Sequence, residues 1–297
     1  MFSLNATATT AGRTLSRQTP QVFGVQARNM ATLREIQGRL KSVSNISKIT
    51  KSMKMIASTK MTRAQRNMES ARVYGKANNE LFRQAEAESN GDQSKTLYIV
   101  SSSDRGLCGG IHSSVTKFTK AALGDAPSSP VVVLGDKAKG PVNRVSKNGV
   151  KLSFNQLGKG SPTFAESSAI ADEILESGIE FDQAKIVYNH FDSAIAYTAS
   201  TIPAFSVQAL KDSGKFAQYE MEDDVLDNLA EFSFANAIHW ALTEGHASEM
   251  AAKMTAMENA TKNAGEMIDK LTLSYNRGRQ AVITNELIDI ITGASAL

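Results

Sequence analysis

The sequence contains a single cysteine, Cys108, among its 297 residues. A disulfide framework and a thiol switch within the chain are therefore excluded, and a reducing compartment is consistent with this composition. The four histidines are scattered without ligand spacing, so no metal site is predicted. Apolar runs of membrane-spanning length are missing too. With 41% hydrophobic and 21% charged residues, the composition is typical of globular proteins, at a length of about two domains.

Acidic residues are missing from the first part of the chain, where Glu35 is the first. Residues 1–30 instead carry several Ser and Thr residues and three arginines, Arg13, Arg17 and Arg28. Such a composition, without the apolar core of a secretory signal, is typical of an organelle transit peptide. We predict a transit peptide over 1–30 with cleavage after Met30. The alternative is a basic arm that stays attached.

Proline is missing from Leu33 to about Glu88, and apolar or small residues recur there at steps of three and four. This spacing predicts a long helix with a coiled-coil seam over 31–90, reaching roughly 80 Å. The predicted seam consists of Leu33, Ile36, Leu40, Val43, Ile46, Ile49, Met53, Ile56, Met61, Ala64, Met68 and Ala71.

Proline is also missing from Ala247 to Gly293. Alternating steps of four and three predict a second seam, within a C-terminal coiled-coil region at 211–297. Its members are Met250, Met254, Met257, Thr261, Ala264, Ile268, Leu271, Tyr275, Gly278 and Val282. Two long helices at opposite ends of one chain are partners most simply as an antiparallel coiled coil, with the middle of the chain folded between them.

The last part of this C-terminal helix is apolar on most sides. Between Ala281 and Ile291 the aliphatic residues cover nearly every face, whereas Thr284, Glu286 and Asp289 make the run too polar and too short for a membrane span. A helix that is apolar all round is normally enclosed. We therefore predict that the tip lies inside a sleeve of other proteins. The alternative is burial in the chain's own domain.

The N-terminal helix carries charge of only one sign over much of its length. Between Ile36 and Met68 there is no acidic residue and there are eight basic ones: Arg39, Lys41, Lys48, Lys51, Lys54, Lys60, Arg63 and Arg66. A stripe of one sign indicates an acidic partner. Nucleic acid, an anionic membrane and an acidic protein loop all fit. No aromatic residue is interleaved before Tyr74, as nucleic-acid readers often have.

The middle of the chain, 91–210, alternates strand and helix patterns, which predicts an α/β domain with a mostly parallel sheet. Strands are predicted at 95–101, 130–135, 184–189 and 195–207, with a hairpin joining the last two. Helices are predicted at 111–123, 136–147 and 164–177, and again at 223–244.

The loop SSDRGLCGG, Ser102 to Gly110, joins the first strand to a helix. A glycine loop at a helix N-terminus can cradle phosphate. However, the spacing matches neither the P-loop nor the dinucleotide-binding fingerprint, and no lysine follows the glycines. We interpret the loop as a tight turn that needs glycine. Nucleophilic catalysis by Cys108 or by a serine at 101–103 requires a paired base, which the sequence does not reveal.

Three motifs together resemble the γ subunit of F-type ATP synthases, in its mitochondrial form. They are MATLREIQGRLKSVSNISKITKSMKMIASTKM at 30–61, the SSDRGLCGG loop, and SEMAAKMTAMENATKNAGEMIDKLTLSYNRGRQAVITNELIDIITGA at 248–294. All three occur in the family's order, and the resemblance runs from about Ala31 to the C-terminus. It implies an antiparallel coiled coil of the terminal helices plus a Rossmann-like α/β domain at its foot.

The resemblance also implies a function: a non-catalytic central-stalk rotor that couples proton-driven rotation of the c-ring to conformational changes of the catalytic β subunits. The implied partners are the α and β subunits, the δ and ε subunits and the c-ring. No nucleic acid or cofactor is implied, and the membrane is reached only through the c-ring. The implied location is the matrix side of the mitochondrial inner membrane, as a peripheral subunit.

Residues that match the family's motifs are expected to contact the β subunits. Arg279 and Gln280 match an Arg-Gln pair that meets a β loop, and Thr284 and Glu286 fall on further polar positions of that motif. Met53 matches a family position near the lever loop of the β subunit. The basic stripe, through Lys48, Lys51 and Lys54, is expected to face acidic loops of β.

Two other function classes compete with the rotor. One is a basic coiled-coil scaffold for nucleic acid or anionic membrane, and the other is a small-molecule enzyme built on the α/β domain. Association with ATPase catalytic subunits separates the rotor from the scaffold. Tight stoichiometric nucleotide binding or turnover by the isolated chain indicates the enzyme.

Overall fold

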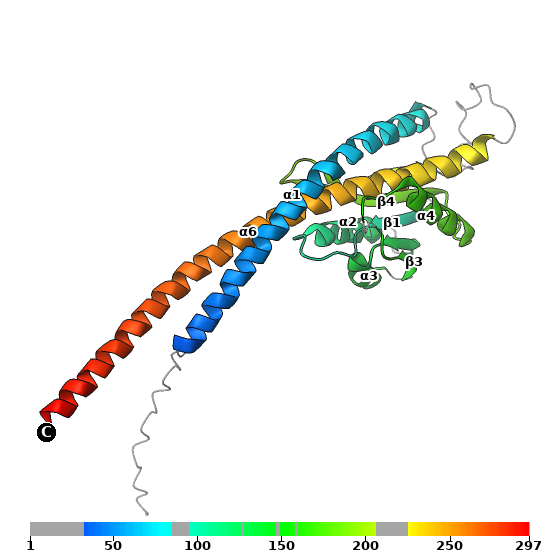
Figure 1. The fold of residues 1–297 in the computed structure, drawn as a ribbon. Helices are drawn as coiled ribbons and strands as arrows, with labels where there is room; N and C mark the ends of the chain where they lie inside the picture. The colour runs from blue at the N-terminus through cyan, green and yellow to red at the C-terminus, as the bar shows by residue number, and fades with distance from the viewer. Residues whose placement is uncertain are drawn as a thin grey trace, which may run out of the picture.

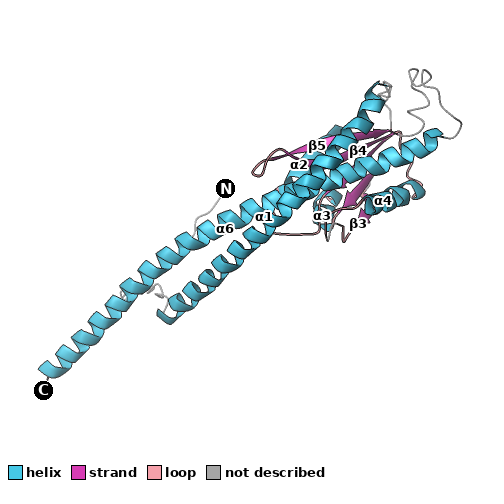
Figure 2. Cartoon of the chain, turned by 45° about the horizontal axis from the view of Figure 1, so that its top comes forward, coloured by secondary structure: helices cyan, strands magenta, loops and turns pink. Residues whose placement is uncertain are grey.

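The computed structural model describes residues 33–84, 95–125, 128–146, 149–157, 160–205 and 225–296. The predicted transit peptide, 1–30, lies outside the described residues. Two long helices run side by side in opposite directions, and an α/β domain packs against one end of the pair (Figures 1 and 2). The predicted fold class, a long antiparallel coiled coil plus an α/β domain, is therefore confirmed.

The two long helices are α1, Leu33–Gln84, and α6, Val225–Ser295, of 52 and 71 residues. Neither contains proline, which would break the backbone hydrogen-bond ladder of a helix interior. The helical patterns predicted at 223–244 and 247–293, within one C-terminal helix, belong to the continuous helix α6. Because α6 runs uninterrupted from the α/β domain to the far end of the molecule, the domain and the coiled coil share one rigid element.

The sheet has the strand order β3-β2-β1-β4-β5. The strands are β1 (Thr96–Ser101), β2 (Val131–Leu134), β3 (Val150–Phe154), β4 (Gln183–Phe191) and β5 (Tyr197–Phe205). The first four pair in parallel, and β5 runs antiparallel to β4, which confirms the predicted hairpin. The edge strand β3 was not predicted, because its burial alternates along only five residues.

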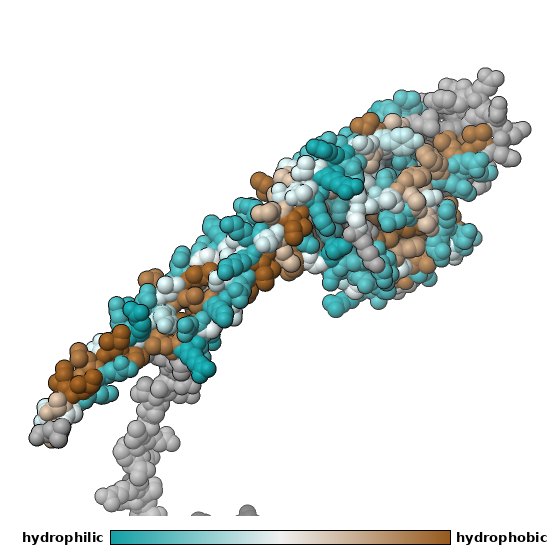
Figure 3. All heavy atoms as spheres, in the orientation of Figure 1, coloured by the Kyte–Doolittle hydropathy of each residue, from teal (hydrophilic) through white to brown (hydrophobic). Residues whose placement is uncertain are grey.

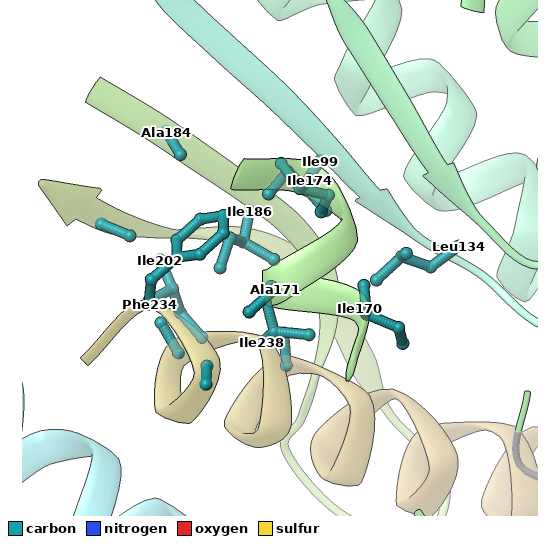
Figure 4. Packing of buried hydrophobic residues seen from close by; sticks show 14 of the residues in the cluster. Ile99, Leu134, Ile170, Ala171, Ile174, Ala184, Ile186, Ile202, Phe234 and Ile238 are labelled. Carbon is teal, nitrogen blue, oxygen red and sulfur yellow. The ribbon is translucent and has the colours of Figure 1, made fainter. Parts of the chain in front are cut away.

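Helices cover both faces of the sheet. On one face α4, Phe164–Glu176, and the first part of α6 bury a core that includes Ile99, Ile186 and Ile238 (Figure 4). On the other face α2, Ile111–Asp125, and α3, Asp136–Asn143, cover Val100 and its neighbours. The start of α6 thus completes the core of the α/β domain before the helix continues as part of the coiled coil.

The predicted seam of α6 is confirmed as far as Gly278. Met250, Met257 and Ala264 are buried, and the other seam members up to Gly278 are half-buried, whereas Val282 is exposed. The middle of the α1 seam was predicted wrongly. Ile46, Ile49 and Ile56 are more than half exposed, and the positions that face α6 are instead Ser47, Thr50 and Ala57.

Candidate functional site

Small side chains let α1 and α6 approach closely. At Gly75 of α1, an added Cβ atom would lie 2.7 Å from Trp240 Cδ2, so any side chain there would collide with the ring. Further along, the Thr261 hydroxyl donates to the Thr50 hydroxyl at 2.8 Å across the seam. Near the start of α1, an added Cβ at Gly278 would lie 3.0 Å from Leu33 Cδ2. The two helices therefore form one narrow shaft rather than two independent rods.

Beyond Gly278, α6 continues alone. Leu33 is the first residue of α1, and every residue from Arg279 to Ala296 is exposed. This segment, the shaft tip, leaves six large aliphatic side chains between 42% and 68% exposed: Val282, Ile283, Leu287, Ile288, Ile290 and Ile291. They form the apolar surface at one end of the molecule in Figure 3. Burial of the tip in the chain's own domain, the alternative interpretation, is therefore wrong.

An exposed apolar surface of this kind marks an interaction site. Fully burying one such side chain contributes about 1.5–3 kcal/mol relative to leaving it exposed. Covering these six side chains with another molecule would therefore stabilise the complex by a large free energy. The shaft tip thus has the chemistry of an element that is covered in an assembly.

The four residues predicted on the tip share this exposed end of α6. Arg279, Gln280, Thr284 and Glu286 are all exposed, and the Thr284 hydroxyl donates back to the Gln280 carbonyl oxygen at 2.9 Å. Within the described residues, neither Arg279 nor Glu286 forms an ion pair. Their charges are therefore available to a partner.

The four residues predicted on α1 form a second, separate group. Lys48 and Lys51 are exposed, and Met53 and Lys54 are half-buried. Lys54 already pairs with Glu258 of α6 at 2.8 Å, so its charge is partly neutralised within the shaft. The Thr50–Thr261 contact fixes this level of the shaft, and Arg279 lies 18 residues further along α6. That separation is about 27 Å, so the structure does not bring the two groups together.

The exposed isoleucines of α1 extend the apolar surface of the shaft. Ile46, Ile49 and Ile56, together with Met55, are between 52% and 67% exposed. They lie on the same helix as the basic stripe. This mixture of large apolar and basic side chains differs from the solvated, mixed-charge face of an ordinary helix and marks an interaction surface.

A buried carboxylate that was not predicted joins the shaft to the α/β domain. Glu244 of α6 is fully buried, and its Oε1 accepts from Arg72 Nε of α1 at 2.6 Å and from Trp240 Nε1 at 2.8 Å. Its Oε2 lies 2.6 Å from His190 Nδ1 of β4. Arg72 also donates to the Phe191 carbonyl oxygen at 3.0 Å. We call this group the Glu244 node.

The Glu244 node was missed because its members are far apart in the chain. His190 was also interpreted only as a structural or surface residue. A usable signal existed: Trp240 and Glu244 are four residues apart, so on a helix they lie on the same face. In the structure the node connects α1, α6 and the sheet. It is positioned to hold the α/β domain in a fixed orientation on the shaft.

The SSDRGLCGG loop is a tight turn, as predicted. Leu107 and Gly109 both have positive φ, near 64° and 63°. Cys108 is buried with its Sγ 3.1 Å from His112 Nε2, which is the base that the sequence did not reveal. However, burial raises the pKa of the Cys108 thiol to about 11, and burial also lowers the pKa of His112. The pair is thus a neutral thiol beside a neutral imidazole, without an activated nucleophile.

Within the part of the chain that the structure describes, no group of three or more His, Cys, Asp or Glu side chains is arranged to hold a metal ion. No helix in the described ranges combines the length and apolarity needed to cross a bilayer.

These features define a class of protein. A stiff two-helix shaft with an uncovered apolar tip, fastened to an α/β domain whose only thiol–imidazole pair is not activated, is a structural subunit of a larger assembly.

The comparisons with known proteins agree. The family model described as ATP synthase matches residues 32–297. The mitochondrial ATP synthase subunit γ of Pichia angusta is 50% identical over 90% of this chain and 100% of its own length, and that of Rattus norvegicus is 48% identical with the same coverage. The chain belongs to the ATP synthase γ-subunit family, in its mitochondrial form, and is a non-catalytic central-stalk subunit.

Solved structures of related assemblies share the fold. A chain of the Euglena gracilis mitochondrial ATP synthase, OSCP/F1/c-ring, matches with a TM-score of 0.74 at 20% identity, covering 89% of this chain and 94% of that chain. A chain of the Tetrahymena thermophila mitochondrial ATP synthase central stalk and c-ring matches with a TM-score of 0.61 at 27% identity, covering 71% and 99%.

Proposed function

We propose that the shaft tip turns inside a ring of α and β subunits and that its rotation drives the β sites through different nucleotide affinities. The exposed apolar tip at the end of a long, stiff coiled coil carries this proposal. A ligand or partner shifts a conformational equilibrium only through differential contacts with the alternative states. Because α6 projects alone beyond α1, the tip is asymmetric about its axis, so subunits around it meet different surfaces at each angle.

The polar side chains of the tip then have a definite role. Arg279 and Gln280 contact one β loop, and Thr284 and Glu286 make further polar contacts nearby. The residues predicted on α1 face acidic loops of the β subunits. They are Lys48, Lys51, Lys54 and, beside them, Met53. Charged and polar groups buried without partners are costly, so each of these needs a specific partner in the ring.

The α/β domain is the foot of the stalk in this proposal. It binds the δ and ε subunits and stands on the c-ring, so that proton-driven rotation of the c-ring turns the shaft. This arrangement places the subunit on the matrix side of the mitochondrial inner membrane, attached only through the c-ring. The Glu244 node supports it, because it ties the foot to both helices of the shaft.

Replacing Arg279 with Glu tests the assignment of the tip. We expect the variant complex to assemble but to lose most of its coupled ATP synthesis, because an attractive contact with a β loop becomes repulsive. The matched control is Arg277→Glu, an equally exposed arginine of the same helix that the proposal gives no contact. ATP synthesis is measured in reconstituted vesicles, normalised to assembled complex.

Equal synthesis rates in the Arg279→Glu variant and in the unmodified complex would remove the proposed role of that residue. A chain that fails to co-purify with ATPase catalytic subunits would remove the rotor function itself.

A further inference from the structure

A large hollow lies where the shaft meets the α/β domain. It has a volume of about 680 Å³ and is bounded by α1, by α6 and by residues 160–163, which lead into α4. Ala57, Ala64 and Met250 supply apolar wall, and Ser161 supplies a hydroxyl that accepts from the Asn67 side-chain amide at 2.7 Å. Ligand sites in proteins typically have volumes of about 300–1,000 Å³, so the hollow has the size of a small-molecule site.

The charged groups that line the hollow are all basic. Lys60 and Arg63 come from α1, Lys253 comes from α6, and Arg105 comes from the SSDRGLCGG loop. No Asp or Glu is among the lining residues. Within the described residues, Lys60, Arg63 and Lys253 form no ion pair. By contrast, Lys54 on the same helix is paired with Glu258.

The state of His246, which also lines the hollow, agrees with a positive local potential. Burial, followed by the nearby charges of Lys60 and Arg105, lowers the pKa of His246 to about 4. The imidazole is therefore neutral at physiological pH and adds no charge of its own. A charged imidazole is disfavoured at this position mainly by burial, and the positive charges of Lys60 and Arg105 add to the effect.

Two carboxylates of this region, Glu249 and Glu166, lie outside the lining of the hollow. Glu249 is 5% exposed, lines the neighbouring smaller cavity rather than the hollow, and hydrogen-bonds with Ser103. Burial raises the pKa of Glu249, against the lowering effects of the Ser103 hydrogen bond and of the charges of Lys253 and Arg105. Glu166 is occupied in the capping box of α4, where its side chain accepts from the backbone N–H of Thr163. The lining of the hollow therefore keeps its basic character, although Glu249 interacts electrostatically with Lys253 and Arg105.

We propose that this hollow binds the phosphate groups of a small polyphosphate, free or carried by a nucleotide. The lysines and arginines that line the hollow suit a di- or triphosphate, which Arg and Lys bind through charge-assisted hydrogen bonds. A single orthophosphate is too small, since the hollow has the volume of about 20 waters. The ligand would bridge α1, α6 and the segment before α4, and so stiffen the junction between shaft and domain. The site does not depend on the rotor function.

Calorimetric titration of the full chain with tripolyphosphate, pyrophosphate and ADP at physiological ionic strength tests the site. We expect saturable one-to-one binding, and a melting temperature that rises with ligand concentration because only the folded chain holds the site. Similar affinities for pyrophosphate and ADP identify free polyphosphate as sufficient, and tighter binding of ADP identifies a nucleotide. Either result supports the site.

Variants of the lining residues distinguish binding in the hollow from non-specific electrostatic attraction to the chain. Lys60→Gln with Arg63→Gln, and Lys253→Gln alone on the other helix, should each weaken tripolyphosphate binding by about tenfold or more, as loss of a charge-assisted hydrogen bond does. The matched control, Arg39→Gln with Lys41→Gln, removes two charges from the same helix outside the hollow and should change affinity less than about twofold. Circular dichroism checks that each variant folds.

Three results would overturn the proposal. The first is no binding at millimolar tripolyphosphate. The second is equal weakening in the hollow variants and in the Arg39/Lys41 control, which indicates non-specific attraction. The third is tighter binding of a polyglutamate peptide with the same dependence on Lys60 and Arg63, which indicates that an acidic protein segment occupies the hollow.

Discussion

Glu244 offers the most discriminating test of how the shaft is held on the α/β domain. The proposed change is Glu244→Gln, which keeps the shape of the side chain and removes its charge. In the folded chain, Glu244 Oε1 accepts hydrogen bonds from Arg72 Nε at 2.6 Å and from Trp240 Nε1 at 2.8 Å. Its Oε2 lies 2.6 Å from His190 Nδ1. An amide oxygen can still accept from Arg72 Nε and Trp240 Nε1, but it carries no charge, so the Arg72 guanidinium loses its buried counter-ion.

The magnitude follows from burial. Removing one partner of a buried ion pair typically costs about 3–5 kcal/mol, because the other charge is left without compensation. Arg72 is 24% exposed and keeps its bond to the Phe191 carbonyl oxygen, so we expect the lower end, about 3 kcal/mol. The chain contains its own control in Glu258→Gln. Glu258 also lies on α6 and also pairs with a cation of α1, but it is 56% exposed.

For the exposed pair of Glu258 with Lys54 the expected loss is below about 1 kcal/mol. The two variants should therefore differ by at least about 2 kcal/mol, or roughly 1 M in the urea midpoint at a typical denaturant slope. Trp240 is the only tryptophan of the chain and belongs to the node, so its fluorescence reports the unfolding of this region directly. Equal midpoints for the two variants would refute the view that the buried node, rather than ion pairing in general, stabilises the junction.

Two further predictions concern pH. The Cys108 thiol, with its pKa raised from 9.0 to about 11, should react with iodoacetamide at a rate that rises about tenfold per pH unit up to pH 11 in the folded chain, whereas the rate should level off near pH 9 in urea. For His246, the folded chain keeps the imidazole neutral down to about pH 4 while the unfolded chain binds a proton near 6.5. Stability should therefore be full above pH 6.5 and fall toward pH 4, and this fall should be shallower in His246→Asn; identical slopes in urea titrations would contradict it.

The sequence predicted the shaft because its physics is local and periodic. Steps of three and four without proline specify a helix with one apolar face, and the seam of α6 follows this pattern from Met250 to Gly278. The α/β domain was predictable for a similar reason, since alternating strand and helix patterns allow few topologies. The tip was also predictable, because an all-round apolar helix needs an enclosure that the chain itself does not provide.

The middle of α1 shows where periodicity fails. The pattern favoured Ile46, Ile49 and Ile56 on the seam, because it assigns large apolar residues to the nearest partner. The structure instead places the hydroxyls of Thr50 and Thr261 in contact there and leaves the isoleucines exposed. A sequence cannot say which of two apolar faces meets its own chain and which meets another. Only the Trp240–Glu244 part of the Glu244 node could be predicted from spacing, because its other contacts join residues as far apart as 72 and 244.

The burial along α6 explains why this subunit needs an assembly. The helix spans roughly 105 Å, and its environment changes in three stages. Around Ile238 it is covered by both the sheet and α1, around Ala264 it is covered by α1 alone, and from Arg279 onward nothing in the described chain covers it. Short isolated helices are marginal in water, because packing of an apolar face supplies most of their stability. A tip of 17 exposed residues, Arg279 to Ser295, therefore depends for a fixed helical conformation on surfaces supplied by other subunits. The exposed residues leave the isolated tip weakly stabilised and also make it responsive to its surroundings, because each covering surface adds contacts that no described part of this chain makes.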